Sequence, residues 1–289
     1  MTELVVLGAG GMLGRALVEH LAQHAPRIAA RADVDVTNRN ALQSFIPEGA
    51  TVINASAYTD VDGAESDEAA AFAINADAVR LIAETVKAKG GRLIHISTDY
   101  VFDGTASEPY DEGGTRSPRS AYGRSKLHGE QAVEDILPYS GVIARTAWLY
   151  GYPGKSFPAT ILRASQNREF LDVVTDQVGQ PTWTGDVAAM VESLVVNDIR
   201  HGIFHATNSG QTSWNGFARA VFRQAGLDEE KVRPVTSEAF PRPAPRPSYS
   251  VLGHSAWGRH GLKEPRPWED ALAEAWAQEL HHVLEDVAT

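Results

Sequence analysis

The sequence contains no cysteine in its 289 residues, and it has no long apolar run. Without cysteine there are no disulfides, thiolate nucleophiles or cysteine-bound metals, although this absence does not identify a compartment. A membrane-spanning helix needs roughly 18 consecutive apolar residues, and no segment approaches that length. The N-terminal residues carry no basic segment or cleavage site typical of a secretory leader. We therefore expect a cytoplasmic protein with no membrane partner.

Positive charge is scarce as well. The chain has 26 lysine and arginine residues against 37 aspartate and glutamate residues, a formal net charge of −11. This balance disfavours a nucleic-acid partner, and any anionic ligand must be held by local devices such as helix N-termini and single arginines. The histidines are scattered without H-E-x-x-H or carboxylates at ligand spacing, so we expect no catalytic metal.

Short apolar runs alternate with segments of helical periodicity. This alternation predicts an α/β fold with a doubly wound parallel Rossmann sheet and a smaller C-terminal α/β substrate-binding lobe. The predicted strands are 4–7, 27–30, 51–54, 92–97, 141–145, 171–174 and 202–206. The predicted helices include a long alanine-rich one at 66–89, followed by 155–168, 186–197 and an amphipathic final helix at 268–287.

A glycine-rich turn follows the first predicted strand. Gly8, Gly11 and Gly14 fit the pattern G-x-x-G-x-x-G, and helical periodicity begins directly afterwards. Such glycines allow a tight turn in which a pyrophosphate approaches the backbone N–H groups at a helix N-terminus. An ordinary strand-to-helix turn could have the same glycines. Their place after the first strand favours nucleotide binding.

The end of the second predicted strand bears on the choice of cofactor. Arg31 suits the 2′-phosphate of NADP, whereas an acid at that place would favour the free 2′-OH of NAD. Asp33 and Asp35 come slightly later, so we expect NADPH and keep NADH as the alternative. A solvated strand-end arginine explains Arg31 equally well. Asp35 and Val36 either precede a short helix or flank the adenine.

Tyr122 and Lys126 lie four residues apart, so in a helix their side chains share a face. Lowering a phenol pKa from about 10 to about 7 takes roughly 4 kcal/mol of preferential phenolate stabilisation, which an ammonium and a bound cofactor could share. Thr98, with Ser97 beside it, ends the fourth predicted strand and could hydrogen-bond a carbonyl. Taken alone, the spacing of Tyr122 and Lys126 more often indicates a surface tyrosine with a solvated lysine. A hydroxyl at a strand end, such as that of Thr98, more often caps a backbone group.

Four motifs occur in a fixed order: the glycine turn, Asn54-Ala55-Ser56-Ala57, Ser97-Thr98-Asp99-Tyr100-Val101-Phe102 and Tyr122-Gly123-x-x-Lys126. Together they resemble the extended short-chain dehydrogenase/reductases and, more narrowly, the dTDP-4-dehydrorhamnose reductase family. The resemblance continues through residues 145–151, 176–182 and 246–252, so it spans nearly the whole chain.

The resemblance implies NADPH-dependent reduction of the C4 ketone of dTDP-4-dehydro-L-rhamnose or a related dTDP-linked 4-keto-6-deoxysugar. Tyr122 would then protonate the C4 oxygen, Thr98 would hold the carbonyl, and Lys126 would bind the nicotinamide ribose and lower the Tyr122 pKa. Asp99 and Trp148 are expected at the substrate. The cofactor would lie on the glycine turn and the third strand end, at Gly8, Gly10, Gly11, Met12, Leu13, Gly14, Ala55, Ser56 and Ala57.

Four further arginines need interpretation. Residues 240–247 alternate proline with other residues, as in a polyproline linker or a PxxP ligand. Because this segment lies inside the resembling region, we expect Arg246 to clamp a diphosphate and Arg242 to be solvated.

Arg145 ends a predicted strand, and we expect it to pair with an acid. Arg15 stands where some family members carry a glutamate of a magnesium-linked dimer, so we carry over neither that metal nor that dimer, and a homodimer remains open.

Three alternatives remain. A nucleotide-sugar dehydratase would carry the motif Thr-Asp-Glu, with glutamate where this chain has Tyr100. A nucleotide-sugar epimerase would return the hydride to the substrate. A non-catalytic NADP-binding regulatory subunit, similar to that of methionine adenosyltransferase, would not need Thr98, Tyr122 and Lys126.

We expect residues 1–147 to form the NADP-binding Rossmann domain, residues 148–289 mainly the substrate-binding lobe, and about 170–200 to return to the first domain.

Overall fold

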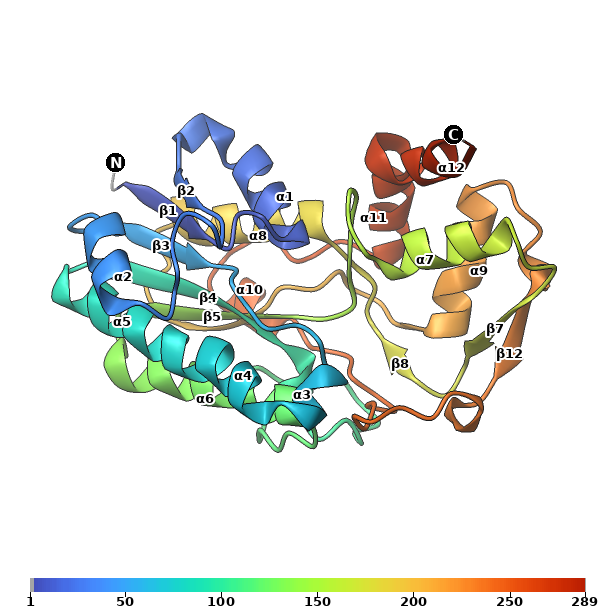
Figure 1. Ribbon diagram of the computed structural model, residues 1–289, viewed down its shortest axis with the longest axis horizontal. Helices are drawn as coiled ribbons and strands as arrows, with labels where there is room; N and C mark the ends of the chain where they lie inside the picture. Colours follow the sequence, from blue (N-terminus) through green and yellow to red (C-terminus); the bar gives the residue numbers. More distant parts are fainter. Residues whose placement is uncertain (1–2, 289) are drawn as a thin grey trace.

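A six-stranded parallel sheet forms the centre of the larger lobe (Figure 1) in the computed structural model, which describes residues 3–288. Its spatial order is β10-β5-β4-β3-β1-β2, so the chain reverses direction across the sheet between β1 and β3. The predicted doubly wound α/β fold is confirmed. The strands are β1 (Leu4–Leu7), β2 (Arg27–Ala29), β3 (Thr51–Asn54), β4 (Arg92–Thr98), β5 (Gly141–Thr146) and β10 (Gly202–His205).

Helices cover both faces of this sheet. Along β1, Leu4 and Val6 face one core cluster, and Val5 and Leu7 face the other. Burial on both faces explains why these strands read as continuous apolar runs rather than as alternating patterns. The first face is covered by α1 (Met12–His20), α8 (Thr184–Val196) and α10 (Ser255–Arg259), and the second by α2 (Arg39–Phe45), α5 (Ala78–Ala88) and α6 (Ala121–Ile136).

The smaller lobe has its own apolar core, at the right of Figure 1. Here β7 pairs in parallel with β12 and does not join the central sheet, whereas α8 and β10 pack in the larger lobe. The domain boundaries remain a prediction. The elements of this lobe are α7 (Phe157–Ser165), β7 (Leu171–Val174), α9 (Trp214–Gln224), β12 (Val232–Val235), α11 (Trp268–Ala275), a π-helical segment (Trp276–Leu280) and α12 (His282–Ala288).

Short elements complete the chain. The two-residue strands β6 and β9 pair in parallel, and β8 and β11 pair antiparallel. Their bounds are β6 (Leu149–Tyr150), β8 (Val178–Gly179), β9 (Thr182–Trp183) and β11 (Thr212–Ser213), and the 3-10 turns are Ala22–His24, Asp99–Val101, Glu229–Lys231 and Ser237–Ala239.

The long helix predicted at 66–89 is confirmed in extent, since residues 68–88 are helical without a break, but a π-helical segment lies inside it and Asp67 precedes its first turn. The structure divides it into α3 (Gly63–Ser66), α4 (Glu68–Phe72), a π-helical segment (Ala73–Asp77) and α5. Asp67 separates α3 from α4 because its backbone, at φ −138° and ψ 67°, is not helical, and its side chain caps α4 by accepting from Ala70 N. Gly90, at φ +63°, ends α5 as a left-handed residue, as expected of a C-terminal glycine.

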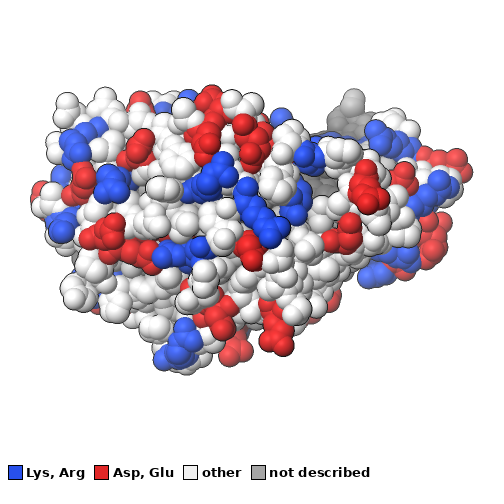
Figure 2. Space-filling view, turned by 90° about the horizontal axis from the view of Figure 1, so that it is seen from below, with Lys and Arg blue, Asp and Glu red and all other residues white. Residues whose placement is uncertain are grey.

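Charged side chains are mixed over the surface. On the face in Figure 2, basic and acidic side chains are interspersed rather than gathered into one region of a single sign. None of the helices described is long and apolar enough to span a membrane.

A buried ion pair joins the sheet to α6. The Arg145 guanidinium donates two 2.8 Å hydrogen bonds to the Glu130 carboxylate, and both side chains are fully buried. The predicted pairing of Arg145 with an acid is confirmed. Arg145 also donates to the Glu112 carbonyl. The Glu112 carboxylate in turn accepts from Ala256 N, so the loop at 103–118 is partly interior.

We predict that Glu130→Gln will lower the free energy of unfolding by about 3–5 kcal/mol, because it leaves the buried Arg145 charge without its counter-ion. The matched control is Glu68→Gln, which breaks the exposed Arg124 pair and should cost less than about 1 kcal/mol. Urea unfolding followed by circular dichroism measures both values. Similar losses in the two variants would contradict the importance of the buried pair.

Candidate active site

The glycine turn connects β1 to α1 at the carboxyl edge of the sheet. Gly8 has a left-handed backbone at φ +81°, and an added Cβ would lie 2.6 Å from Ser56 N. The turn therefore packs directly on the residues that follow β3, as a Rossmann cofactor site requires. Gly11 is the N-cap of α1 and provides no side-chain cap, so the first-turn amides suit a pyrophosphate. Met12, Leu13 and Gly14 form that first turn.

The residues after β2 lie in an exposed turn. Arg31 is exposed there, as are Asp33 and Asp35. Asp35 accepts hydrogen bonds from the Thr37 backbone and hydroxyl, which lower its pKa, and the charge of Arg31 lowers it further. Asn38, rather than Asp35, caps α2 by accepting from Asn40 N and Ala41 N.

A buried asparagine fixes the loop after β3. The Asn75 side chain accepts from Tyr58 N and donates to Tyr58 O and to the Ser125 hydroxyl on α6. It thereby ties the segment that begins at Ala55, Ser56 and Ala57 to the helix that carries Tyr122. Sequence reasoning placed Asn75 inside a helix but assigned it no role.

Thr98, Tyr122 and Lys126 come together where β4 ends beside α6. Ser120 caps this helix by accepting from Gly123 N at 3.0 Å, which places Tyr122 and Lys126 in its first turns. The Tyr122 side chain is nearly buried, and the Thr98 hydroxyl acts to lower the pKa of its phenol. The Lys126 ammonium donates a 2.6 Å hydrogen bond to the Ile96 carbonyl.

Burial dominates the ionisation of this group. It raises the pKa of Tyr122 to about 12, and the charge of Asp99 acts in the same direction. It also lowers the pKa of Lys126 to about 8, against the attraction of Glu130. In the protein alone desolvation of the phenolate outweighs the other effects, and the lowering of the Tyr122 pKa with cofactor bound remains a prediction. A phenol that keeps its proton is the form that a proton donor needs.

Asp99 lies behind Thr98. It is 4% exposed, and its Oδ1 accepts from the Thr98 hydroxyl at 2.9 Å. Burial raises its pKa to about 6. The side chain thus orients Thr98, while direct contact of Asp99 with a substrate remains a prediction.

A cavity of about 650 Å³ opens between the two lobes. Trp148 and Arg246, both expected at the substrate, line it together with Tyr100 and Trp214, to which sequence reasoning gave no role. The Tyr100 ring meets the Tyr122 ring edge-on at 5.6 Å between centroids, so the cavity extends toward the phenol.

Arg246 is held by an acid that sequence reasoning also missed. Its guanidinium donates to Asp62 Oδ2 at 2.8 Å, and Asp62 Oδ1 accepts from Ala244 N. Arg242 is more exposed and lies 3.9 Å from the same carboxylate. No local sequence pattern signals this contact, because Asp62 and Arg246 are 184 residues apart.

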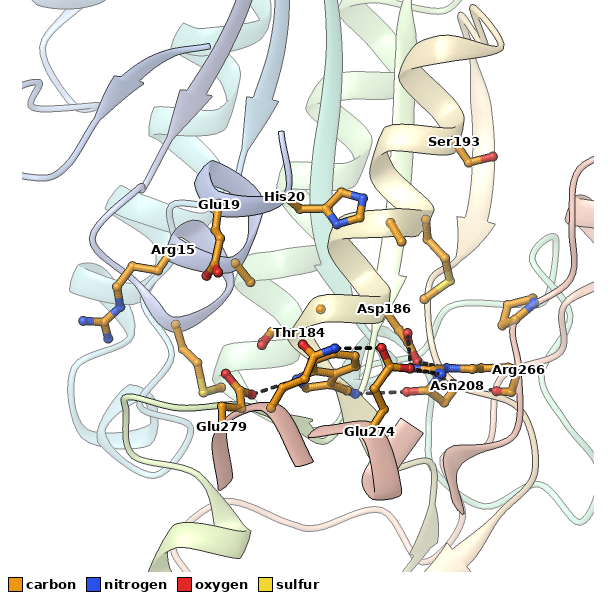
Figure 3. Close-up of a pocket in the computed structure, with 18 of the residues that line it drawn as sticks. Arg15, Glu19, His20, Thr184, Asp186, Ser193, Asn208, Arg266, Glu274 and Glu279 are labelled. Atoms are coloured by element: carbon orange, nitrogen blue, oxygen red, sulfur yellow. Dashed lines mark hydrogen bonds and ion pairs between the residues drawn. The ribbon is translucent and has the colours of Figure 1, made fainter. Parts of the chain in front are cut away.

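A larger cavity, about 790 Å³, lies elsewhere, between α1, α8 and α11 (Figure 3). Its polar wall is already paired, since Asp186 accepts from Arg266 and from Asn208. Thr98, Tyr122 and Lys126 are not among the described residues that line it. Of these two cavities, only the smaller one is lined by Tyr100, whose ring contacts Tyr122.

One group of metal-ligand type is present in the described part of the chain. His281, His282 and Glu285 on the final helix have ligand atoms within 4.8 Å of one another. His282 is also hydrogen-bonded to Glu285 at 2.7 Å, as an ordinary helix-surface pair. The group is not part of the wall of the 650 Å³ cavity.

We predict that Lys126→Met will stabilise the cofactor-free protein at pH 7 by roughly 1–3 kcal/mol, because it removes a buried ammonium. Since Lys126 titrates near pH 8 when folded and near 10.5 when unfolded, the unfolded chain binds more protons between these values. Wild-type stability should therefore rise relative to the variant across that window. Urea midpoints from pH 6 to 11 test this, and a wild-type advantage at pH 7 would contradict it.

The chain is similar to proteins of established families over nearly its full length. A family model described as RmlD substrate binding domain matches residues 1–281. A probable dTDP-4,6-dihydroxy-2-methyloxan-3-one 4-ketoreductase of Streptomyces antibioticus is 48% identical over 277 residues, 94% of each chain. A dTDP-4-dehydrorhamnose reductase of Mycobacterium tuberculosis is 45% identical over 282 residues, covering 95% of this chain and 92% of the relative.

A solved structure gives the same result. The dTDP-4-dehydrorhamnose reductase of Bacillus anthracis, in complex with NADP, is 35% identical and superposes with a TM-score of 0.90, covering 96% of this chain and 100% of that one. The resemblance noted in the motifs is thereby confirmed. The chain belongs to the RmlD substrate binding domain family, and with it to the dTDP-4-dehydrorhamnose reductases.

Proposed function

We propose that the protein is an NADPH-dependent oxidoreductase that reduces the C4 ketone of dTDP-4-dehydro-L-rhamnose, or of a closely related dTDP-linked 4-keto-6-deoxysugar, to the alcohol. The observation that carries the proposal is that Thr98, Tyr122 and Lys126 lie where β4 ends beside α6, at the same carboxyl edge of the parallel sheet as an uncapped glycine turn. The names of the relatives and the NADP complex of the Bacillus anthracis protein support it.

Bound NADPH would supply the hydride that C4 receives. The glycine turn would hold its pyrophosphate, Ala55, Ser56 and Ala57 would lie at the nicotinamide ribose, and Lys126 would donate to that ribose. Arg31 would meet the 2′-phosphate, with Asp35 and Val36 near the adenine. NADH is the alternative cofactor.

Tyr122 donates the proton in this proposal. With a pKa of about 12 the phenol is intact at neutral pH, and it loses its proton only to the more basic alkoxide that develops at C4. Thr98 would hold the carbonyl oxygen, and for this its hydroxyl, which donates to Asp99 Oδ1 at 2.9 Å in the protein alone, would turn its proton toward the substrate. The phenolate that results lies on the same helical face as the Lys126 ammonium, which favours charge there.

The nucleotide-sugar would occupy the 650 Å³ cavity, with its sugar toward Tyr100 and Trp148 and its diphosphate at Arg246. The division into a cofactor-binding part (1–147) and a mainly substrate-binding part (148–289), a cytoplasmic location and a homodimer are further parts of the proposal. A regulatory subunit that binds NADP without turnover, or an epimerase, is the alternative.

We predict that the protein oxidises NADPH when given a dTDP-4-keto-6-deoxysugar, and that Tyr122→Phe lowers kcat by about 10²- to 10⁴-fold, since the variant cannot donate the proton. NADPH binding, measured by cofactor fluorescence, should be unchanged and serves as the control. Unchanged turnover would remove Tyr122 as the donor. Stoichiometric NADPH binding without consumption, with a partner enzyme co-purifying, would favour the regulatory alternative.

We further predict that Arg246→Ala raises KM for the dTDP-sugar by about 10- to 150-fold, the value of charged hydrogen bonds of about 1.5–3 kcal/mol. Arg242→Ala is the matched control, because Arg242 is 58% exposed and should change KM less than about threefold. Steady-state kinetics at saturating NADPH measures both. Equal effects would assign the diphosphate to neither arginine specifically.

A further inference from the structure

Trp148 has an unusual backbone conformation. Its φ is +45°, in the left-handed region that bulky L-residues rarely adopt. Such a conformation persists only where the surroundings fix it, and it is common at ligand sites. The Trp148 carbonyl accepts from Thr182 N at 3.2 Å, and the next residue begins β6, so the backbone on this side is fixed by the β6–β9 pair.

One face of the Trp148 indole is covered by Trp214. The two ring centroids lie 3.6 Å apart and the planes differ by 9°, which is a full stack. Phe157 supports Trp214 from behind, with 4.7 Å between ring centroids. Trp214 thus presses Trp148 against the opposite wall.

The opposite wall is the backbone of Gly179. A Cβ added there would lie 2.5 Å from Cε2 of Trp148 and 2.7–2.8 Å from Cζ2 and Nε1. These nearly equal distances to bonded neighbours indicate an approach onto the ring face rather than its edge. Both faces of the indole are therefore covered.

The two walls are joined to each other. In the β8–β11 pair, Thr212 is opposite Gly179 and Ser213 is opposite Val178, and Trp214 follows directly. Ser213 also caps α9 by accepting from Gly216 N at 3.1 Å. The width of the slot around the indole is thus set by backbone pairing and not by side chains alone.

We propose that Gly179 and Trp214 are positioning residues that hold Trp148 edge-on to the hexose of the nucleotide-sugar, so that Trp148 is a rigid wall selecting sugar shape and not a stacking platform. This inference rests on the proposed function. A sugar cannot stack on an indole whose faces are both covered, so it meets only the ring edge. A fixed edge discriminates by fit, for instance for the methyl group of a 6-deoxysugar.

The test uses Trp214→Ala, which removes one wall, and Gly179→Ala, which pushes the indole from the other. Each should raise KM for the dTDP-4-keto-6-deoxysugar by about tenfold or more, the range of a misfitted apolar contact. The inhibition constant of dTDP, which lacks the sugar, and the Kd of NADPH should stay within about twofold. Trp214→Phe should restore most of the wild-type KM, because a phenyl ring can still stack.

Trp276→Ala is the matched control, since it deletes an indole of the same lobe that does not line the cavity. Equal increases in KM for the sugar and in the inhibition constant of dTDP would overturn the inference and assign the tryptophan pair to the base. Unchanged KM in both variants would also overturn it. If the wild-type protein turns over no ketosugar and binds dTDP-L-rhamnose no better than dTDP, the proposed function itself fails. If the wild type is active, only the inference is at stake.

Discussion

The hydrogen bond from the buried Lys126 ammonium to the Ile96 carbonyl is the contact on which the catalytic region depends. It joins α6 to β4 in the interior, where an unpaired charge would be costly. On its other side α6 lies close to the π-helical segment, and Gly129 permits this because any side chain there would collide with the Asn75 carbonyl. Asn75 reaches Tyr58 on one side and Ser125 on the other, so α6 contacts both β4 and the loop after β3.

The same burial determines the chemistry. Desolvation favours the neutral form of every group, so it raises the pKa of Tyr122 and lowers that of Lys126. Before ligands bind, the region therefore tends toward a neutral phenol beside a weakly basic amine. Sequence spacing alone suggested the opposite shift for the tyrosine, because spacing reports proximity of a cation and not the exclusion of water. The strength of an acid in a folded protein depends on both.

The elements that sequence predicted well are those with local signals. Apolar runs identified all six strands of the central sheet, and the order of motifs predicted that Thr98, Tyr122 and Lys126 act together. The failures have a common cause. Asp67 caps the alanine-rich helix at its start and a π-helical segment lies inside it, and neither feature alters the residue pattern that predicts the helix. Asp62 and Trp214 act through partners distant in the sequence, and the two-residue strands that position Trp148 are too short to leave a periodic pattern.

The pair between Asp62 and Arg246 has a consequence for how an anion would enter the cavity. The guanidinium already carries a carboxylate at 2.8 Å, so an arriving diphosphate would exchange one anion for another rather than fill a bare positive site. In such an exchange the net charge at Arg246 changes little. Selectivity then comes from the planar fork of N–H donors of the guanidinium and from the release of Asp62. In this chain of net charge −11, Asp62 keeps the Arg246 guanidinium neutralised until a ligand arrives. Without Asp62, the guanidinium would bind any small anion. Asp62 thus occupies Arg246 until an anion that binds more strongly displaces it, which makes Arg246 selective for such anions.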